Sequence, residues 1–263
     1  MNRDGIYRCF DVRPVLTRLF YPRCEGGGGP ATGEYWPIPV ADGVQLGCLW
    51  FDGGVQAPTI LFFHGNGEIA ADYADVGPLL NGRGISLLVA EYRGYGRSGG
   101  SPTVAAMMAD ARTVFEALEG RRAGRGEIMV MGRSLGSAPA VELARMLGWP
   151  RVSGLVLESG FARAKPLLRT LGVGEGELAK IDSPGLDNVD KIKAYPGPTL
   201  VIHGAQDHLV PVGDGQALYQ ASAAAHKDLL VVPRADHNSL FLYGLDAYLD
   251  AVERLVKASP LAR

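Results

Sequence analysis

The chain has 263 residues, of which 47 % are hydrophobic and 21 % charged, as expected for a soluble globular protein with a sizeable core. Its formal net charge of −2 gives no electrostatic reason to expect a nucleic-acid partner. The three cysteines lie in the first fifth of the chain without C-x-x-C spacing, and the five histidines form no H-x-x-x-H pair. We therefore predict neither a disulfide framework nor a metal site.

Residues 1–34 form a leader that ends in a glycine-rich link, "EGGGGPATG" at 25–33. Charged residues interrupt the leader every few positions, so it has no secretory h-region, and no apolar run in the chain is long enough to span a bilayer. We therefore expect a cytoplasmic protein. Arginines in the leader are interleaved with apolar residues. We expect this basic amphipathic segment to pack on the protein's own body, with peripheral membrane contact as the less favoured alternative.

From residue 35 onward, strand patterns alternate with helix patterns. The segments "EYWPIPV" and "VQLGCLWF" flank the turn "ADG" and are predicted to form two antiparallel strands. Six further segments are predicted as strands, the most apolar of them buried on both faces, at 59–63, 85–92, 127–132, 152–159, 198–204 and 228–233.

Helical patterns are predicted between these strands, over about 69–82, 103–119, 135–147, 213–223 and 240–257. Strands that alternate with helices imply parallel crossover connections, so we predict an α/β fold with a mostly parallel central sheet of about eight strands and helices on both faces. Residues 160–197 interrupt the alternation with several glycines and prolines and one short helical piece near 163–171. We predict a small cap insertion there, within a single domain over 35–263.

The pattern G-x-S-x-G, which surrounds the nucleophilic serine of many hydrolases, occurs twice, at Ser98 and at Ser134. In such enzymes the serine lies on a tight turn between a buried strand and a helix, which exposes its Oγ. The apolar run "EIMVM" leads directly into Gly132, and a helical pattern follows Gly136. Ser98 instead lies in the glycine-rich loop "RGYGRSGGSP" with no helix directly behind it. We therefore predict that Ser134 is the nucleophile.

A serine hydroxyl needs a base within hydrogen-bond reach, and the base needs a carboxylate to orient it. Such residues are expected in loops at the carboxyl ends of strands. His237, in "VVPRADHNSLF", follows the last predicted strand and is the predicted base. Asp207, in "VIHGAQDHLVP", is the favoured acid, and Glu158, at the end of the strand after the nucleophile strand, is the alternative acid.

Two backbone N–H groups are expected to stabilise the oxyanion of the reaction. Leu135 would supply one of them, because it follows the serine at a helix N-terminus. Asn66 would supply the other, from the loop "FFHGNG" after the strand at 59–63. For Arg133, beside the nucleophile, we weigh contact with an anionic substrate group against a surface salt bridge, which is the commoner role.

The chain resembles the α/β-hydrolase superfamily in seven segments. In chain order these are "FFHGNG", "EYRGYGRSGGSPT", "GRSLGSAPAVELA", "LESGF", "LDNVDKIK", "VIHGAQDHLVP" and "ADHNSLF". More narrowly, the chain resembles its abhydrolase-domain subgroup of serine-aminopeptidase-like proteins and protein depalmitoylases, over about residues 36–257. The resemblance implies the α/β-hydrolase fold, with "GRSLG" as the nucleophile elbow. It also implies hydrolysis of an ester, thioester or amide through an acyl-Ser134 intermediate. Our leading prediction is a serine esterase or thioesterase that acts on small acyl substrates without a cofactor.

Two alternatives stay open. An aminopeptidase-like amide hydrolase would bind its substrate's amine through carboxylates, which the cap offers at Glu175, Glu177, Asp182, Asp187 and Asp190, although a solvated surface is the favoured interpretation of these acids. A non-catalytic α/β-hydrolase-like binding protein would usually have lost one of the three catalytic residues, and here none is missing. The depalmitoylases carry a cysteine-rich N-terminus, which this chain lacks. Its short cap predicts an open, shallow acyl site and short acyl chains.

Overall fold

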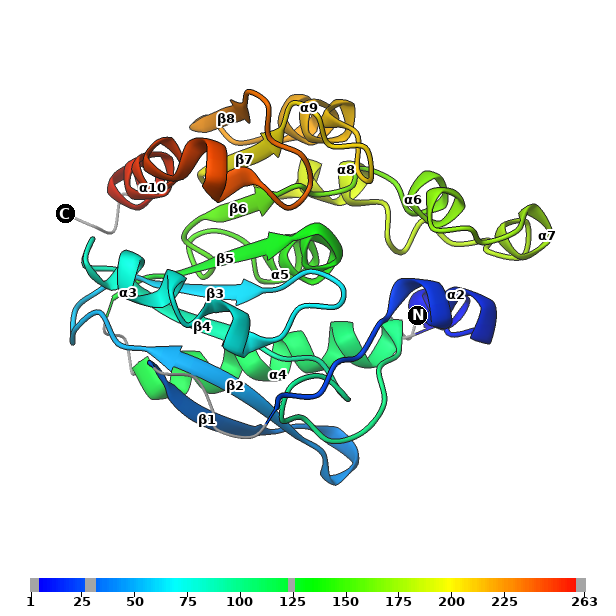
Figure 1. Ribbon diagram of the computed structural model, residues 1–263, viewed down its shortest axis with the longest axis horizontal. Coiled ribbons are helices and arrows are strands. Elements are labelled where there is room, and N and C mark those ends of the chain that lie inside the picture. Colours follow the sequence, from blue (N-terminus) through cyan, green and yellow to red (C-terminus); the bar gives the residue numbers. More distant parts are fainter. Residues whose placement is uncertain (1–4, 27–31, 123–125, 259–263) are drawn as a thin grey trace.

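A computed structural model describes residues 5–26, 32–122 and 126–258. At its centre lies an eight-stranded sheet with the strand order β1-β2-β4-β3-β5-β6-β7-β8 (Figure 1). The strands are β1 Glu34–Pro39, β2 Gln45–Phe51, β3 Thr59–Phe63, β4 Ser86–Ala90, β5 Ile128–Arg133, β6 Leu155–Glu158, β7 Thr199–Gly204 and β8 Lys227–Val232. β2 pairs antiparallel with both β1 and β4, and all other neighbours are parallel. The predicted α/β sheet is confirmed.

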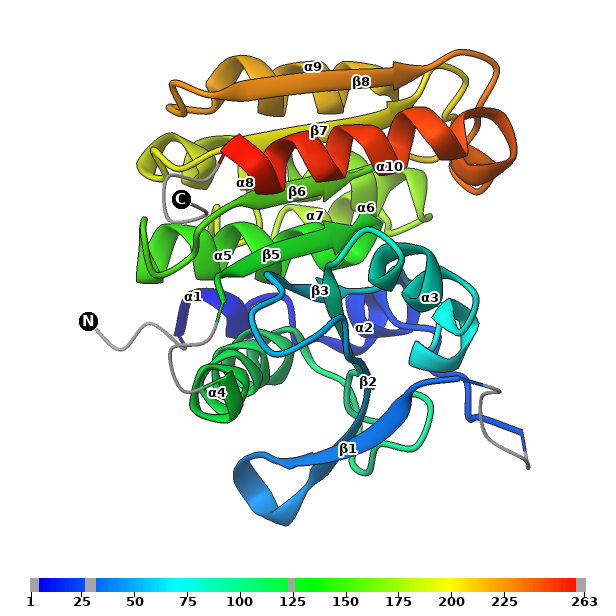
Figure 2. The ribbon, with the colours of Figure 1, turned by 90° about the vertical axis from the view of Figure 1, so that its left-hand side faces the viewer.

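Helices cover both faces of this sheet, with α4 and α5 on the side opposite to α3 and α10 (Figure 2). The α-helices after β1 are α3 Val76–Asn81, α4 Val104–Arg122, α5 Ser137–Leu147, α6 Ala164–Thr170, α7 Glu175–Leu178, α8 Asn188–Lys191, α9 Val212–Ala221 and α10 Leu240–Ala258. The single helix predicted over 69–82 is instead a 3-10 turn, η2 Ala70–Tyr73, followed by α3. Pro78 lacks the N–H that a continuous helix would require, and it is accommodated in the first turn of α3.

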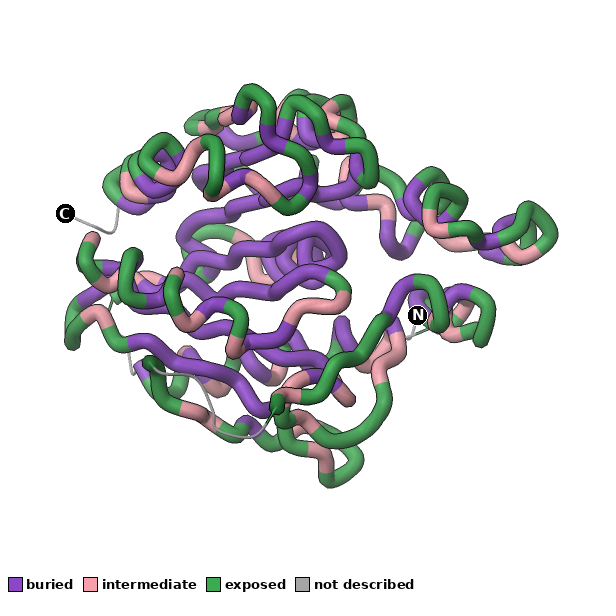
Figure 3. The backbone as a smooth tube through the Cα atoms, viewed as in Figure 1, coloured by how far each residue is buried: buried purple, intermediate pink, exposed green. Residues whose placement is uncertain are grey.

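The core lies on both faces of the sheet, and the central strands are buried along their whole length (Figure 3). The edge strands β1 and β8 contain exposed and half-buried positions and only one buried position each. Uninterrupted apolar runs therefore correspond to central strands, as parallel sheets covered by helices require. Among the described residues, no helix combines the length and the apolar character needed to cross a bilayer.

The leader contains two short helices, α1 Gly5–Arg8 and α2 Arg13–Leu19, which pack on the body of the protein. Its side chains Phe10, Val15 and Phe20 are buried in the same core as α4 and α5. These apolar groups are thus unavailable to a membrane surface in this arrangement, which favours the interpretation that the segment packs on the protein itself. Most of the glycine-rich link, residues 27–31, lies outside the described residues.

The cap insertion is more helical than its sequence predicts, because it contains α6, α7, α8 and the 3-10 turn η4 Ile192–Ala194. Helix α6 packs against α2 of the leader at the edge toward which the parallel strands point (Figure 1). Two segments far apart in the sequence therefore meet above the carboxyl ends of the strands, where open α/β sheets bind their ligands.

Candidate active site

Ser134 lies on a strained turn between β5 and α5. Its backbone φ of 51° is in the left-handed region, which residues other than glycine rarely adopt. A Cβ atom at Gly132 would collide with the backbone of Gly136, and one at Gly136 would collide with the carbonyl oxygen of Phe63. Both glycines of the motif are therefore needed for the close approach of strand and helix that shapes this turn.

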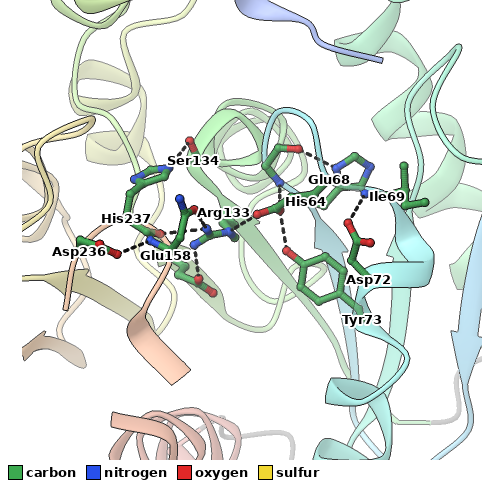
Figure 4. Close-up of polar contacts among 12 residues, drawn as sticks. His64, Glu68, Ile69, Asp72, Tyr73, Arg133, Ser134, Glu158, Asp236 and His237 are labelled. Atoms are coloured by element: carbon green, nitrogen blue, oxygen red, sulfur yellow. Dashed lines mark hydrogen bonds and ion pairs between the residues drawn. The ribbon is translucent and has the colours of Figure 1, made fainter. Parts of the chain in front are cut away.

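Ser134, His237 and Asp207 form a chain of hydrogen bonds. His237 Nδ1 donates to Asp207 Oδ2 across 2.7 Å. Ser134 Oγ lies 3.0 Å from His237 Nε2 (Figure 4). Because Nδ1 carries the proton in the bond to the carboxylate, Nε2 of a neutral ring is free to accept the hydroxyl proton of Ser134. The three residues come from three different loops, after β5, β7 and β8.

The Asp207 carboxylate is held in its ionised form. Burial alone would raise its pKa, but hydrogen bonds from His203 and His237 outweigh that effect and hold the pKa well below its usual range. The backbone N–H groups of Leu209 and Val210 also donate to Oδ1, at 3.0 and 2.8 Å. An anionic and fully hydrogen-bonded Asp207 can orient the His237 ring.

Glu158, the alternative acid, contacts Arg133 and Tyr248. Its carboxylate accepts hydrogen bonds from Arg133 Nη1 and from Tyr248 Oη, each at 2.7 Å. In this structure Asp207, and not Glu158, contacts the imidazole of His237.

Arg133 has neither of the two roles weighed from the sequence, because its guanidinium is buried and its donors are engaged within the protein. It donates to Glu68 at 2.6 Å, to Glu158, to the backbone carbonyl oxygen of His237 at 2.9 Å and to Asn238 Oδ1 at 2.8 Å (Figure 4). Burial opposes the positive charge, but the two carboxylates raise the pKa of Arg133 above its ordinary value. Sequence reasoning missed this role, because the partners lie far away along the chain.

The loop after β3 is braced by His64. Its Nδ1 donates to the carbonyl oxygen of Gly65 at 2.8 Å, and its Nε2 lies 3.1 Å from the buried carboxylate of Glu91. Burial lowers the pKa of the His64 ring, but the Glu91 carboxylate more than compensates, so that the pKa is raised overall. A buried His64–Glu91 pair thus fixes the loop that carries Asn66.

A pocket of about 180 Å³ opens beside Ser134 Oγ. Asn66 and Leu135, the predicted backbone donors, line it together with Ser134 and His237. One side of this pocket is apolar and is formed by Leu19, Leu167, Leu171 and Leu209. The arrangement can hold a small acyl group against the serine.

Ser98 is remote from this chain of hydrogen bonds. Its Oγ accepts a hydrogen bond from the backbone N–H of Gly47 at 3.0 Å. Gly94, Gly96 and Gly100 of the same loop adopt positive φ angles, as expected of a glycine-rich turn. Ser98 therefore has a structural partner in strand β2.

Comparisons with known proteins identify relatives of this chain. A family model described as serine aminopeptidase, S33 matches residues 55–182. An uncharacterized protein of Mycobacterium tuberculosis is 32 % identical over 225 residues, which cover 83 % of this chain and 77 % of the relative. The chain belongs to the α/β-hydrolase superfamily. Human alpha/beta hydrolase domain-containing protein 17B is a further relative of this α/β-hydrolase, 29 % identical over 85 % of this chain and 75 % of its own.

Solved α/β-hydrolase structures share the fold. The Pyrococcus furiosus esterase Pf2001 superposes with a TM-score of 0.73 at 21 % identity, over 90 % of this chain and 98 % of that one. A soluble variant of the Saccharomyces cerevisiae monoglyceride lipase gives a TM-score of 0.66 at 15 % identity, over 86 % of this chain and 95 % of that one. The protein is a serine hydrolase of the α/β-hydrolase fold.

Proposed function

We propose that this protein is a carboxylesterase or thioesterase that cleaves small acyl substrates through an acyl-Ser134 intermediate. The observation that carries the proposal is the chain of hydrogen bonds from Ser134 through His237 to Asp207 beside a small pocket with an apolar side. The esterase and lipase names among the structures of the same fold support it.

In the first step, Ser134 Oγ attacks the carbonyl carbon of the substrate, and its proton passes to His237 Nε2. The C–O or C–S bond to the leaving group then breaks, and His237 gives the proton to the departing alcohol or thiol. Water attacks the acyl-Ser134 ester in the same way, with His237 as base, and releases a carboxylic acid. Asp207 stabilises the imidazolium that forms in each half of the reaction.

The tetrahedral intermediate of each step carries a negatively charged oxygen. In our proposal the backbone N–H groups of Asn66 and Leu135 donate to it. Both residues line the pocket together with Ser134. Leu135 also belongs to the turn at the start of α5, where N–H groups have no partner within the helix. Loss of one such donor typically costs about 10²–10³ in rate.

The size and chemistry of the pocket favour small acyl groups. Its volume of about 180 Å³ is below the roughly 300–1,000 Å³ of pockets that bury drug-sized ligands. Among the described residues that line the pocket, only Glu68 carries a carboxylate, and the Arg133 guanidinium already pairs with it. A substrate ammonium group would therefore find no unpaired carboxylate there.

The cap acids do not favour the aminopeptidase alternative either. Glu175 pairs with Arg169, Glu177 with Lys180, and Asp187 and Asp190 with Arg163, all at exposed or half-exposed positions away from the pocket lining. These pairs favour the interpretation that these four cap acids belong to a solvated surface.

The test is an assay with p-nitrophenyl esters of two to sixteen carbons, acyl thioesters and aminoacyl p-nitroanilides. We expect ester and thioester hydrolysis biased to short chains. Ser134→Ala should reduce it to background, and Ser98→Ala, which alters the duplicate motif, should retain it. A fluorophosphonate should label the wild type on Ser134, as mass spectrometry of the labelled peptide would show.

Three outcomes would contradict the proposal. Cleavage of aminoacyl anilides without cleavage of esters would assign an aminopeptidase. Activity that survives Ser134→Ala, or is lost in a folded Ser98→Ala variant, would place the nucleophile elsewhere. A folded wild type that neither hydrolyses these substrates nor reacts with the fluorophosphonate would indicate a binding protein.

A further inference from the structure

The N-terminal segment, residues 5–26, is anchored to the protein body at several points. Asp11 accepts hydrogen bonds from the backbone N–H of Val104 at 2.6 Å and of Ala105 at 3.3 Å, at the start of α4. Lys191 Nζ lies 3.1 Å from the Tyr7 hydroxyl. Val15 of α2 is fully buried. The segment is thus held in one position relative to the sheet.

The end of this segment reaches the candidate active site. Leu19, the last residue of α2, lines the pocket of Ser134 together with Leu167 and Leu171 from the cap. Leu19 is 3 % exposed and Leu167 is 8 % exposed, whereas Leu209 is 36 % exposed. Among these four side chains, Leu19 and Leu167 are therefore the most buried, and Leu209 is the most exposed.

Two residues after Leu19, the chain is fixed to the loop that carries the oxyanion donor. The backbone N–H of Tyr21 lies 2.6 Å from Asn66 Oδ1 and 2.8 Å from the hydroxyl oxygen of Tyr95. The Tyr95 hydroxyl, on a fully buried ring, donates to the same Asn66 oxygen at 2.8 Å. This triangle of hydrogen bonds fixes the position of Leu19 relative to Ser134, because both belong to elements that contact the same loop.

We propose that the N-terminal segment is the acyl-specificity element of this enzyme, with Leu19 as the residue that limits the length of the acyl chain. The inference rests on the proposed esterase or thioesterase function and adds the structural origin of its chain-length limit. The Leu19 side chain occupies the inner wall against which the methyl end of a short acyl group packs. A smaller side chain at position 19 opens space beyond that wall, toward α6.

The experiment compares wild type with Leu19→Ala on p-nitrophenyl butyrate and octanoate. In hydrophobic pockets a single methylene changes kcat/KM by about 10–200-fold. We expect Leu19→Ala to raise the ratio of kcat/KM for octanoate over butyrate at least about tenfold. Leu19→Val, which removes less volume and disturbs the fold less, should shift the same ratio in the same direction by a smaller factor.

Val15→Ala is the matched control, since Val15 belongs to the same helix and is buried, but does not line the pocket. It should lower the melting temperature and leave the ratio of octanoate to butyrate unchanged. An unchanged ratio in Leu19→Val, or an equal shift in Val15→Ala, would overturn the specificity role and leave the proposed function intact. Absence of any Ser134-dependent hydrolysis by wild type would overturn both proposals.

Discussion

The guanidinium of Arg133 donates a hydrogen bond to the backbone carbonyl oxygen of His237 across 2.9 Å, and so joins the residue before the candidate nucleophile to the candidate base. The same guanidinium bonds Glu68, which follows the loop of Asn66. A single buried cation at the end of β5 therefore contacts both the loop that carries His237 and the segment after the Asn66 loop. Its loss should affect both stability and the geometry of the site.

We expect Arg133→Met to destabilise the fold by about 3–5 kcal/mol, because it leaves the carboxylates of Glu68 and Glu158 close together without their cation. Arg133→Lys keeps the charge but not the planar set of donors, so it should fold and lose about tenfold or more in kcat with a smaller change in KM. Urea unfolding and steady-state kinetics measure the two effects. Arg112→Met, which breaks an exposed pair with Glu116, is the control and should change neither the free energy of unfolding nor kcat. Wild-type kcat in Arg133→Lys would contradict a positioning role.

The choice between the two candidate acids can be tested by neutralising each one. Asp207→Asn should lower kcat by about 10³–10⁴-fold, because the imidazole loses the carboxylate that orients it and stabilises its charged form. Glu158→Gln should lower the melting temperature but keep kcat within about tenfold, because its carboxylate contacts Arg133 and Tyr248 and not His237. The reverse pattern of kcat values would identify Glu158 as the catalytic acid.

Two glycine substitutions should have opposite effects on the stability of the protein. Gly136→Ala places a Cβ against the carbonyl oxygen of Phe63, so we expect a destabilised protein, by about 1–3 kcal/mol, with little esterase activity. Gly120→Ala, within α4 and with open space around its Cβ position, should stabilise the protein by about 0.5–1 kcal/mol and leave activity unchanged. Chemical denaturation and the ester assay measure both variants. A fully active Gly136→Ala would show that the elbow tolerates a side chain there.

A buried ion pair should make stability depend on pH. Glu142 lies 2.9 Å from Lys191 Nζ and 2.6 Å from Arg145 Nη2. Burial alone would raise the pKa of Glu142, but these cations lower it to about 2 from an ordinary 4.5. Since the pKa is lowered on folding, the unfolded chain binds the proton more readily. The stabilisation is complete above about pH 4.5 and is lost as the pH falls toward 2.

We therefore expect Glu142→Gln to lower the melting temperature at neutral pH and to flatten its decline between pH 4.5 and pH 2. Thermal unfolding across this range measures both changes. Glu116→Gln, at an exposed pair with Arg112, should retain the pH dependence of the wild type. Identical curves for Glu142→Gln and wild type would contradict the assignment.

The strands and the turn at Ser134 are the features that the sequence predicts best, because their causes are local. A wholly apolar run such as 59–63 identifies a strand covered on both faces. The glycines at 132 and 136 are required by contacts within the strand–turn–helix unit and with the adjacent strand. Sequence order and placement after strands were also sufficient to nominate His237 and Asp207, which the structure brings within hydrogen-bond distance of each other.

Only the tertiary structure shows that Asp207, and not Glu158, contacts the imidazole of His237, because both residues follow strands of the same sheet and the packing of the loops determines which carboxylate reaches the ring. It also decided the environment of Arg133, which bonds His237 across 104 residues of sequence. Similarly, composition marks the leader as basic and amphipathic, but the position of Leu19 in the pocket depends on its packing against a cap helix far along the chain. Local patterns determined the elements and the candidate residues, whereas contacts between distant segments determined which of those residues share a site.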